Sequence, residues 1–299
     1  MKRLLFLGAG EIGTALAHVI DDRAVIEMWD KDPKRARKMR SLDACVPEAD
    51  VIFVCIPSWA VREVMMSIKP FLKPKTVIVS LAKGIEEKTL KTMDAVLAAS
   101  LPAKQPFGIL GGPLLAEELM ADLPGIAVFA STPKTAYKEL ASLFAGSMVR
   151  LEHESDPHTV ALTAVLKNVY AVGLGIADGL GWGWNGKGWL AAQALTEMAA
   201  IVKLLKGNPA LVDGSAGAGD FLATAMSPDS RNQSTGREIA MTGTCRIQSE
   251  GCRSISSVLL LLKKNVRHFP LLTAIHSIIT EQQKAEHVFH DLLTPRRGA

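Results

Sequence analysis

One lysine lies alone in a neutral stretch of the chain. Lys167 carries the only formal charge between Asp156 and Asp178, and Asn168 follows it directly. At helical spacing the pair lies on a strip of small side chains, which leaves room for a bound molecule beside the ammonium group. A positioned ammonium can stabilise the negative charge that develops on a carbonyl oxygen during reduction, and can then donate a proton to it. The alternative is a structural lysine whose stem lies along apolar surface while its ammonium reaches water.

Further residues capable of chemistry lie in turns of the same half of the chain. Asp220 follows the glycine turn Gly217-Ala218-Gly219, and the segment Ser230-Arg231-Asn232 places a guanidinium beside a capping hydroxyl. The planar guanidinium fork matches phosphate oxygens in a bidentate manner, so this segment is suited to hold a phosphate. Glycines and Ser-Pro steps also occur in ordinary loops. Glu250 precedes an apolar helix, where capping is the simplest interpretation.

A glycine pattern near the N-terminus indicates a dinucleotide site. Residues 2–7 form an apolar run of strand length, followed by Gly8-Ala9-Gly10-Glu11-Ile12-Gly13 and a helical pattern. In this context Gly8 makes the tight turn, Gly10 lets the backbone approach a pyrophosphate, and Gly13 allows close packing of helix and strand. The N-terminus of the helix favours the phosphate charge. We therefore assign cofactor binding to Gly8, Gly10, Glu11, Ile12 and Gly13.

The end of the second predicted strand bears on the choice of cofactor. This strand ends at Asp30, where an acidic residue binds the ribose hydroxyls of NAD and disfavours the 2′-phosphate of NADP. A short basic helix is expected after Asp32. Its charges either face solvent or, through Lys31, Lys34 or Arg35, bind that phosphate. We expect NAD or NADP as the cofactor, with NAD slightly preferred.

Strands and helices alternate through the first half of the chain, which predicts an α/β fold with a doubly wound, mostly parallel sheet. Strand signals stop after Glu152, so we expect a dinucleotide-binding domain at residues 1–153 and an all-helical substrate domain at residues 154–299. The predicted strands cover residues 2–7, 25–29, 51–56, 76–80, 107–110, 126–130 and 148–151, and the predicted helices include residues 60–68, 86–98 and 133–145.

Residues that directly follow strands are candidates for ligand binding in such a fold, because ligands bind beyond the carboxyl ends of the strands. Lys83 follows the strand that ends at Ser80, and Gly112 lies in the Gly-Gly-Pro turn after the next strand. A lysine in a loop is otherwise most often a surface charge.

The composition is globular, with 48% apolar and 21% charged residues among 299. A net charge of +4 is too small to argue for nucleic acid or an anionic membrane as a partner. The four cysteines show no metal-ligand spacing, so we expect free thiols and no metal. No apolar segment approaches the roughly 18 residues of a membrane span. We expect a cytoplasmic protein that binds a small molecule.

Taken in order, the motifs resemble those of the NAD(P)-dependent glycerol-3-phosphate dehydrogenases, particularly the bacterial type. They are GAGEIG, SLAKG, GGP, VLKNV, DGLGWGWN, GAGD, SPDSRN and SEG, and they span nearly the whole chain. The resemblance implies a Rossmann domain joined to an all-helical domain like that of 6-phosphogluconate dehydrogenase. It also implies a homodimer that interconverts dihydroxyacetone phosphate and sn-glycerol 3-phosphate, a phosphorylated substrate, and so feeds glycerophospholipid synthesis.

The resemblance further implies roles for individual residues. Lys167 is similar to the proton donor and acceptor, Lys83 to a second lysine at the substrate oxygens, and Asp220 to the carboxylate that orients the catalytic lysine. Asn168 completes the catalytic set. Substrate binding is implied for Lys83, Gly112, Lys167, Asp220, Ser230, Arg231 and Asn232, and cofactor contact for Ala116, Arg231 and Glu250. Cofactor contact by Asp30, Lys31 and Lys83 is expected from their positions after strands, and Asp30 itself replaces a glycine that is common in bacterial relatives.

The chain departs from the family pattern at two places. Leu114 stands where bacterial relatives carry Ser or Thr after the Gly-Pro turn, so a hydrogen bond to the substrate is lost or supplied elsewhere. The segment between Asp30 and Val51 is shorter than usual and is expected to lack a strand, which affects the adenine side of the cofactor site. Three other functions stay open: a hydroxy-acid dehydrogenase of the same superfamily, an NAD-binding regulator without catalysis, and a structural partner-binding domain.

Overall fold

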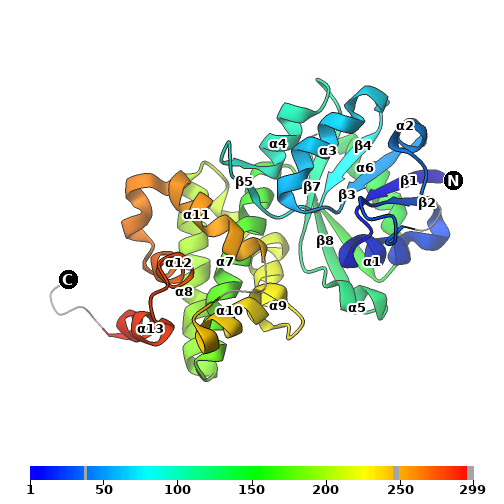
Figure 1. The fold of residues 1–299 in the computed structure, drawn as a ribbon. Coiled ribbons are helices and arrows are strands. Elements are labelled where there is room, and N and C mark those ends of the chain that lie inside the picture. Colours follow the sequence, from blue (N-terminus) through cyan, green and yellow to red (C-terminus); the bar gives the residue numbers. More distant parts are fainter. Residues whose placement is uncertain (37–38, 133, 245–248, 295–299) are drawn as a thin grey trace. The chain divides into compact units, whose positions relative to one another are not determined.

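The chain folds into two compact units, Met1–Ala161 and Leu162–Ala299. The computed structural model describes residues 1–36, 39–132, 134–244 and 249–294, and Figure 1 shows them as a ribbon. All the strands that the structure describes belong to the first unit, and the described part of the second unit is helical. An α/β unit followed by a helical unit is the architecture that the sequence predicts.

A seven-stranded sheet organises the first unit, with strand order β2-β1-β3-β4-β7-β8-β9. Neighbouring strands are parallel except β7 and β8, which are antiparallel. The expected mostly parallel sheet is therefore confirmed. The strands are β1 (Lys2–Leu7), β2 (Ala24–Trp29), β3 (Val51–Val54), β4 (Val77–Ser80), β7 (Phe107–Gly111), β8 (Gly125–Ala130) and β9 (Val149–Glu154).

Helices cover both faces of this sheet (Figure 1). On one face α1, α5 and α6 share an apolar cluster with strand residues that include Phe6 and Phe53. The rings of these two residues stack with their centroids 4.6 Å apart. Helices α3 and α4 pack together on the other face. The helical elements of this unit are α1 (Glu11–Ile20), η1 (Asp21–Arg23), α2 (Leu42–Cys45), η2 (Val46–Glu48), η3 (Ser58–Ala60), α3 (Val61–Ile68), η4 (Lys69–Phe71), α4 (Met93–Ser100), α5 (Ala116–Met120) and α6 (Lys134–Phe144).

Strand β2 lies at one edge of the sheet. Among the described residues between β2 and β3, the only regular elements are α2 and η2, so the expected lack of a strand in this shortened segment is confirmed for them. The prediction of a basic helix after Asp32 is wrong for residues 33–36, 39 and 40, which the structure describes. The backbone N–H groups of Lys34 and Arg35 bond to the Asp32 carboxylate and carbonyl, each at 3.0 Å, and close a turn instead. Arg37 and Lys38 lie outside the described residues.

A short hairpin replaces the beginning of the helix expected at residues 86–98. Strands β5 (Ile85–Glu86) and β6 (Lys91–Thr92) pair antiparallel before α4 begins. Glu86 makes a bidentate ion pair with Arg62 of α3, at 2.6 and 2.8 Å, and Leu90 turns the chain with a φ of +54°. This contact between segments distant in sequence overrides the local helical pattern.

The second unit contains the longest helices of the chain. Helix α7 begins at Pro157, and the boundary between the two units falls within it. The elements are α7 (Pro157–Gly179), α8 (Trp184–Leu204), η5 (Pro209–Asp213), η6 (Ser215–Gly219), α9 (Asp220–Met226), α10 (Arg231–Thr242), α11 (Glu250–Leu262), η7 (Lys263–His268), α12 (Pro270–Thr280) and α13 (Ala285–Leu293).

Helices α7 and α10 cross with their backbones in contact. A Cβ atom on Gly236 would lie 2.2 Å from the carbonyl oxygen of Val172, and one on Gly175 would lie 2.3 Å from that of Gln233. Only glycine permits such a close approach of two helix backbones. The crossing fixes the start of α10 against α7.

A buried carboxylate joins three helices of this unit. Glu197 of α8 accepts a hydrogen bond from the Tyr170 hydroxyl of α7 at 2.8 Å. It also accepts from the backbone N–H groups of Leu271 and Leu272, at 2.8 and 2.9 Å, which lie in the first turn of α12 and have no partner within that helix. Burial raises the pKa of Glu197.

Helix α7 corrects the expectation that no apolar segment is long enough to span a membrane. It has 23 residues, and one window of 18 has a mean hydropathy of 1.6. That whole window is buried inside the protein, a property of core helices in water-soluble folds. Length and composition alone therefore did not exclude a span.

Candidate active site

The glycine loop after β1 forms an open cradle. Gly8 has a φ of +106°, and a Cβ atom there would lie 2.5 Å from the carbonyl oxygen of Cys55. A Cβ on Gly13 would lie 2.2 Å from the Gly8 carbonyl oxygen, whereas one on Gly10 would meet nothing within 4 Å. Helix α1 begins directly after Gly10, and no described side chain caps it. The loop, where the order of the strands reverses, thus fits the pyrophosphate of a dinucleotide.

The carboxylate of Asp30 lies at this cradle. One oxygen accepts a hydrogen bond from the backbone N–H of Ala9 at 2.8 Å, and the other accepts from that of Asp32 at 2.9 Å. Each carboxylate oxygen can accept a second hydrogen bond, so ribose hydroxyls can still bind. Lys31, the next residue, is exposed.

A neutral thiol lies beneath the cradle. Burial raises the pKa of Cys55 to about 12, so the thiol stays protonated at neutral pH. Cys45, Cys55 and Cys252 are free, as expected, and Cys245 lies outside the described residues.

In the second unit, Lys167 is buried with a carboxylate. Its side chain is 6% exposed, and its Nζ atom lies 3.0 Å from Oδ1 of Asp220, whose side chain is 3% exposed. Nζ also donates a hydrogen bond to the Thr224 hydroxyl at 2.6 Å. Helix α7 supplies the lysine and α9 the two acceptors. The structure therefore does not support the interpretation that the ammonium of Lys167 reaches water.

Asn168 is held by the start of α10. Its side-chain oxygen accepts a hydrogen bond from the amide of Asn232 at 2.9 Å, and the other end of that amide accepts from the backbone N–H of Gly251 at 3.1 Å. Both asparagines are buried. The side chain of Ser230 caps α10 through the backbone N–H of Gln233 at 3.4 Å. Arg231, at the first position of α10, is exposed.

Comparison with known proteins identifies the family. The models for the N-terminus and the C-terminus of NAD-dependent glycerol-3-phosphate dehydrogenase match residues 39–137 and 156–290. A glycerol-3-phosphate dehydrogenase (NAD(P)+) from Salinibacter ruber is 31% identical over 97% of this chain and 94% of its own length. Another, from Geobacter metallireducens, is 29% identical over 98% and 97%. The crystal structure of glycerol-3-phosphate dehydrogenase from Coxiella burnetii superposes with a TM-score of 0.90 at 27% identity, covering 99% of each chain.

The chain belongs to the NAD-dependent glycerol-3-phosphate dehydrogenase family. It is therefore an NAD(P)-dependent oxidoreductase, with the Rossmann-type sheet and helical C-terminal domain that its sequence predicts.

Within this dehydrogenase framework the predicted residues fall into two groups. Lys167, Asn168, Asp220 and Asn232 form one connected cluster in the second unit, with Ser230 and Arg231 beside it on α10. Glu250 begins α11, next to Gly251. Lys83 follows β4, Gly112 follows β7 with a φ of +100°, and Ala116 begins α5, all in the first unit.

Leu114 differs from the hydroxyl-bearing residue expected after the Gly-Pro turn. Its side chain is partly buried against the apolar cluster beneath α1 and α5, near Gly125 and Leu119. Leu114 contributes packing in the first unit and offers no hydrogen bond to a ligand.

Thr224 is not among the residues predicted from the sequence. Its position four residues after Asp220, on a helix that follows a glycine turn, places both side chains on one face and is the signal that could have found it.

Proposed function

We propose that the chain interconverts dihydroxyacetone phosphate and sn-glycerol 3-phosphate by hydride transfer with NAD(P)H, with Lys167 as the proton donor and acceptor. The buried ion pair between Lys167 and Asp220, at 3.0 Å, carries the proposal. The names of relatives that match nearly the whole chain support the choice of substrate.

Charge development in the reaction explains why a buried ammonium is useful. The cofactor, when bound, supplies the hydride to the substrate carbonyl carbon and takes it back in the reverse direction. The electron pair of the carbonyl bond moves to its oxygen, where the Lys167 ammonium stabilises the charge and donates a proton. Asp220 balances the ammonium charge, and together with Thr224 it restricts the directions in which Nζ points. In oxidation the lysine amine accepts the hydroxyl proton.

The start of α10 is the proposed site for the substrate phosphate. Arg231 can bind phosphate oxygens in a bidentate manner, and the N-terminus of α10 adds a positive partial charge. The bond from Asn232 to Asn168 links this segment to the residue beside the catalytic lysine. Substrate binding is also proposed for Lys83, Gly112, Asp220 and Ser230.

The cradle after β1 is the proposed cofactor site, with Gly8, Gly10, Glu11, Ile12 and Gly13 at the pyrophosphate. Asp30 supports a slight preference for NAD, because its carboxylate lies at the loop and would repel a 2′-phosphate. Exposed Lys31 opposes that preference. Cofactor contacts are also proposed for Lys83, Ala116, Arg231 and Glu250.

The same proposal covers the wider setting of the enzyme. Residues 1–153 form the dinucleotide-binding domain and residues 154–299 the substrate domain. The protein acts as a cytoplasmic homodimer and feeds glycerophospholipid synthesis, as the family resemblance implies.

One spectrophotometric assay tests the proposed reaction. NADH and NADPH are each mixed with dihydroxyacetone phosphate, with unphosphorylated dihydroxyacetone, and with a panel of 2-oxo acids. Turnover of the phosphorylated ketone far above the others is expected. Faster reduction of an oxo acid would support the hydroxy-acid alternative, and cofactor binding without any turnover would support a regulator.

A further inference from the structure

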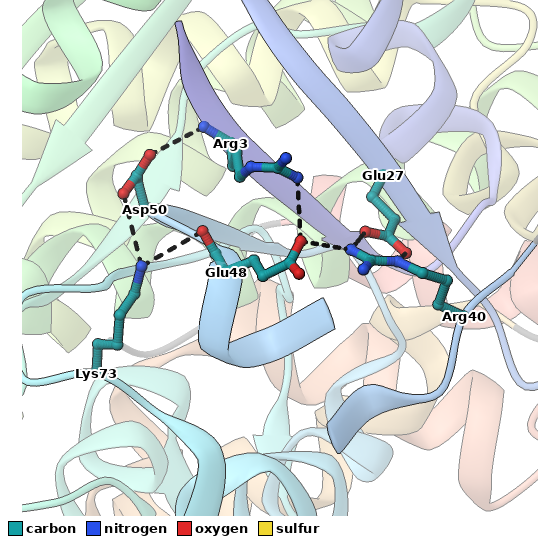
Figure 2. A network of polar contacts seen from close by, with 6 residues as sticks. All are labelled: Arg3, Glu27, Arg40, Glu48, Asp50 and Lys73. Atoms are coloured by element: carbon teal, nitrogen blue, oxygen red, sulfur yellow. Dashed lines mark hydrogen bonds and ion pairs between the residues drawn. The ribbon is translucent and has the colours of Figure 1, made fainter. Parts of the chain in front are cut away.

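A cluster of six charged side chains lies at the edge of the sheet in the first unit, outside the residues assigned to chemistry (Figure 2). It consists of Arg3, Glu27, Arg40, Glu48, Asp50 and Lys73. Arg40 joins two of the acids: its guanidinium bonds to both oxygens of Glu27, at 2.8 and 2.5 Å, and to Glu48 at 2.9 Å. These bonds raise the pKa of Arg40 and lower that of Glu48, so both stay charged near neutral pH.

Arg40 lies at the end of the segment that leaves β2 at Asp30, and the segment means here its described residues 30–36 and 39–40. The backbone N–H of Asp30 bonds to the sulfur of Met39 at 3.4 Å, so the two ends of this segment meet. Glu27 lies on edge strand β2, and Glu48 ends η2 just before β3. The guanidinium therefore attaches the returning end of the segment to edge strand β2 and to helix η2. The described residues contain no further strand that could hold this end.

The other end of the segment touches the cofactor cradle. Asp30 bonds to the backbone N–H of Ala9, between the two glycines of the loop, and Asp32 closes the turn that carries Lys34 and Arg35. Movement of the segment would therefore displace the groups that face the adenosine ribose in the proposed site.

We propose that Arg40 is a positioning residue for the adenine side of the cofactor site, holding the segment after β2 in place through Glu27 and Glu48. This inference rests on the proposed binding of NAD(P) at the glycine cradle. Arg40 acts through Asp30 and its turn, and touches neither substrate nor the reacting atoms. Preorganisation of a binding loop improves affinity because less ordering remains to be done on binding.

The test measures binding rather than turnover alone. Arg40→Met is compared with wild type in titrations of NADH, followed by fluorescence, and of ADP-ribose, which carries the adenine half without nicotinamide. We expect both dissociation constants to rise about 3- to 10-fold in the variant, a loss of preorganisation, with kcat at saturating NADH unchanged. Arg40→Lys should give an intermediate value, because a point charge cannot bind Glu27 through a fork.

Arg3→Met is the matched control. Arg3 contacts the same Glu48, at 3.0 Å, but lies on β1 and makes no side-chain hydrogen bond or ion pair to the described residues of the segment. It should leave both dissociation constants at wild-type values. If Arg40→Met folds poorly, Glu27→Gln is measured in its place. This variant removes the carboxylate that binds Arg40 through two bonds, and its dissociation constant for ADP-ribose should rise in the same way.

The outcomes distinguish the positioning role of Arg40 from the proposed NAD(P)-dependent function. If wild type binds cofactor and Arg40→Met binds ADP-ribose equally well, the positioning role is refuted while the proposed function stands. An equal effect of Arg3→Met would also refute it, since the cluster would then act only on general stability. If wild type binds neither NADH nor NADPH, both proposals fail.

Discussion

The buried pair of Lys167 and Asp220 permits a prediction that separates catalysis from folding. Lys167→Met replaces the ammonium with an apolar chain of similar length and leaves the Asp220 carboxylate, only 3% exposed, without its counter-charge. Removing one partner of a buried ion pair typically lowers the free energy of unfolding by about 3–5 kcal/mol. The single variant should therefore be markedly less stable, and Asp220→Asn should be destabilised for the complementary reason.

The double variant Lys167→Met with Asp220→Asn removes both charges together. Its loss of stability should be smaller than the sum of the two single losses by about 0.5–3 kcal/mol, the usual coupling between interacting sites. Urea unfolding of the four proteins at pH 7 measures this coupling. Additive losses would show that the two groups do not interact as a charged pair.

Turnover is measured on the same proteins under conditions in which each is folded. Both variants that lack the lysine should lose about 10²–10⁴-fold in kcat, the range for a positioned acid–base group. Recovery of stability in the double variant should bring no recovery of turnover. Near-normal turnover with Met at this position would remove Lys167 from the mechanism.

Three further predictions follow from the described contacts. Arg231→Ala should lower kcat/KM with dihydroxyacetone phosphate by at least ~30-fold, as for a truncated charge-assisted phosphate contact. It should scarcely change the slow reduction of unphosphorylated dihydroxyacetone. Equal losses with both ketones would rule out binding of the substrate phosphate by Arg231. The ratio of turnover efficiency with NADH to that with NADPH should exceed one and should fall in Asp30→Ala; a wild-type ratio below one rejects the preference. Glu197→Gln should lower the free energy of unfolding by about 1–3 kcal/mol, because an amide cannot accept all three hydrogen bonds. Burial raises the folded-state pKa of Glu197. The difference in free energy of unfolding between wild type and this variant should therefore shrink as pH rises from the ordinary carboxyl value of 4.5 toward the raised pKa. A constant difference over that pH interval would contradict a raised pKa for Glu197.

Local patterns in the sequence were sufficient for the elements whose signals lie within a few residues. The apolar run before Gly8 and the glycine spacing predicted β1, the cradle and α1, because strand, turn and helix each depend on neighbours in the chain. The isolation of Lys167 in a neutral stretch likewise indicates a special environment, although it does not name the partner.

The remaining features depend on contacts between distant residues. The hairpin before α4 depends on Arg62, which is 24 residues from Glu86, and the bond between Asn168 and Asn232 spans 64 residues. The three partners of Glu197 belong to two other helices. Periodicity within one segment carries no information on such pairings, so sequence patterns do not indicate the role of the Glu197 carboxylate.

The glycine crossing of α7 and α10 has a consequence for how the enzyme can change. Glycine in a helix interior usually costs about 1 kcal/mol relative to alanine, so replacing it is a standard route to a more stable protein. At Gly175 and Gly236 that route is closed, because the added methyl group would lie 2.2–2.3 Å from a carbonyl oxygen of the other helix. At these two positions backbone lies against backbone, so no larger side chain can be introduced there to tilt α10 and gradually move Asn232 relative to Asn168. Evolution of a new substrate preference in this scaffold should therefore begin in loops such as the one that carries Leu114, while the crossing stays unchanged.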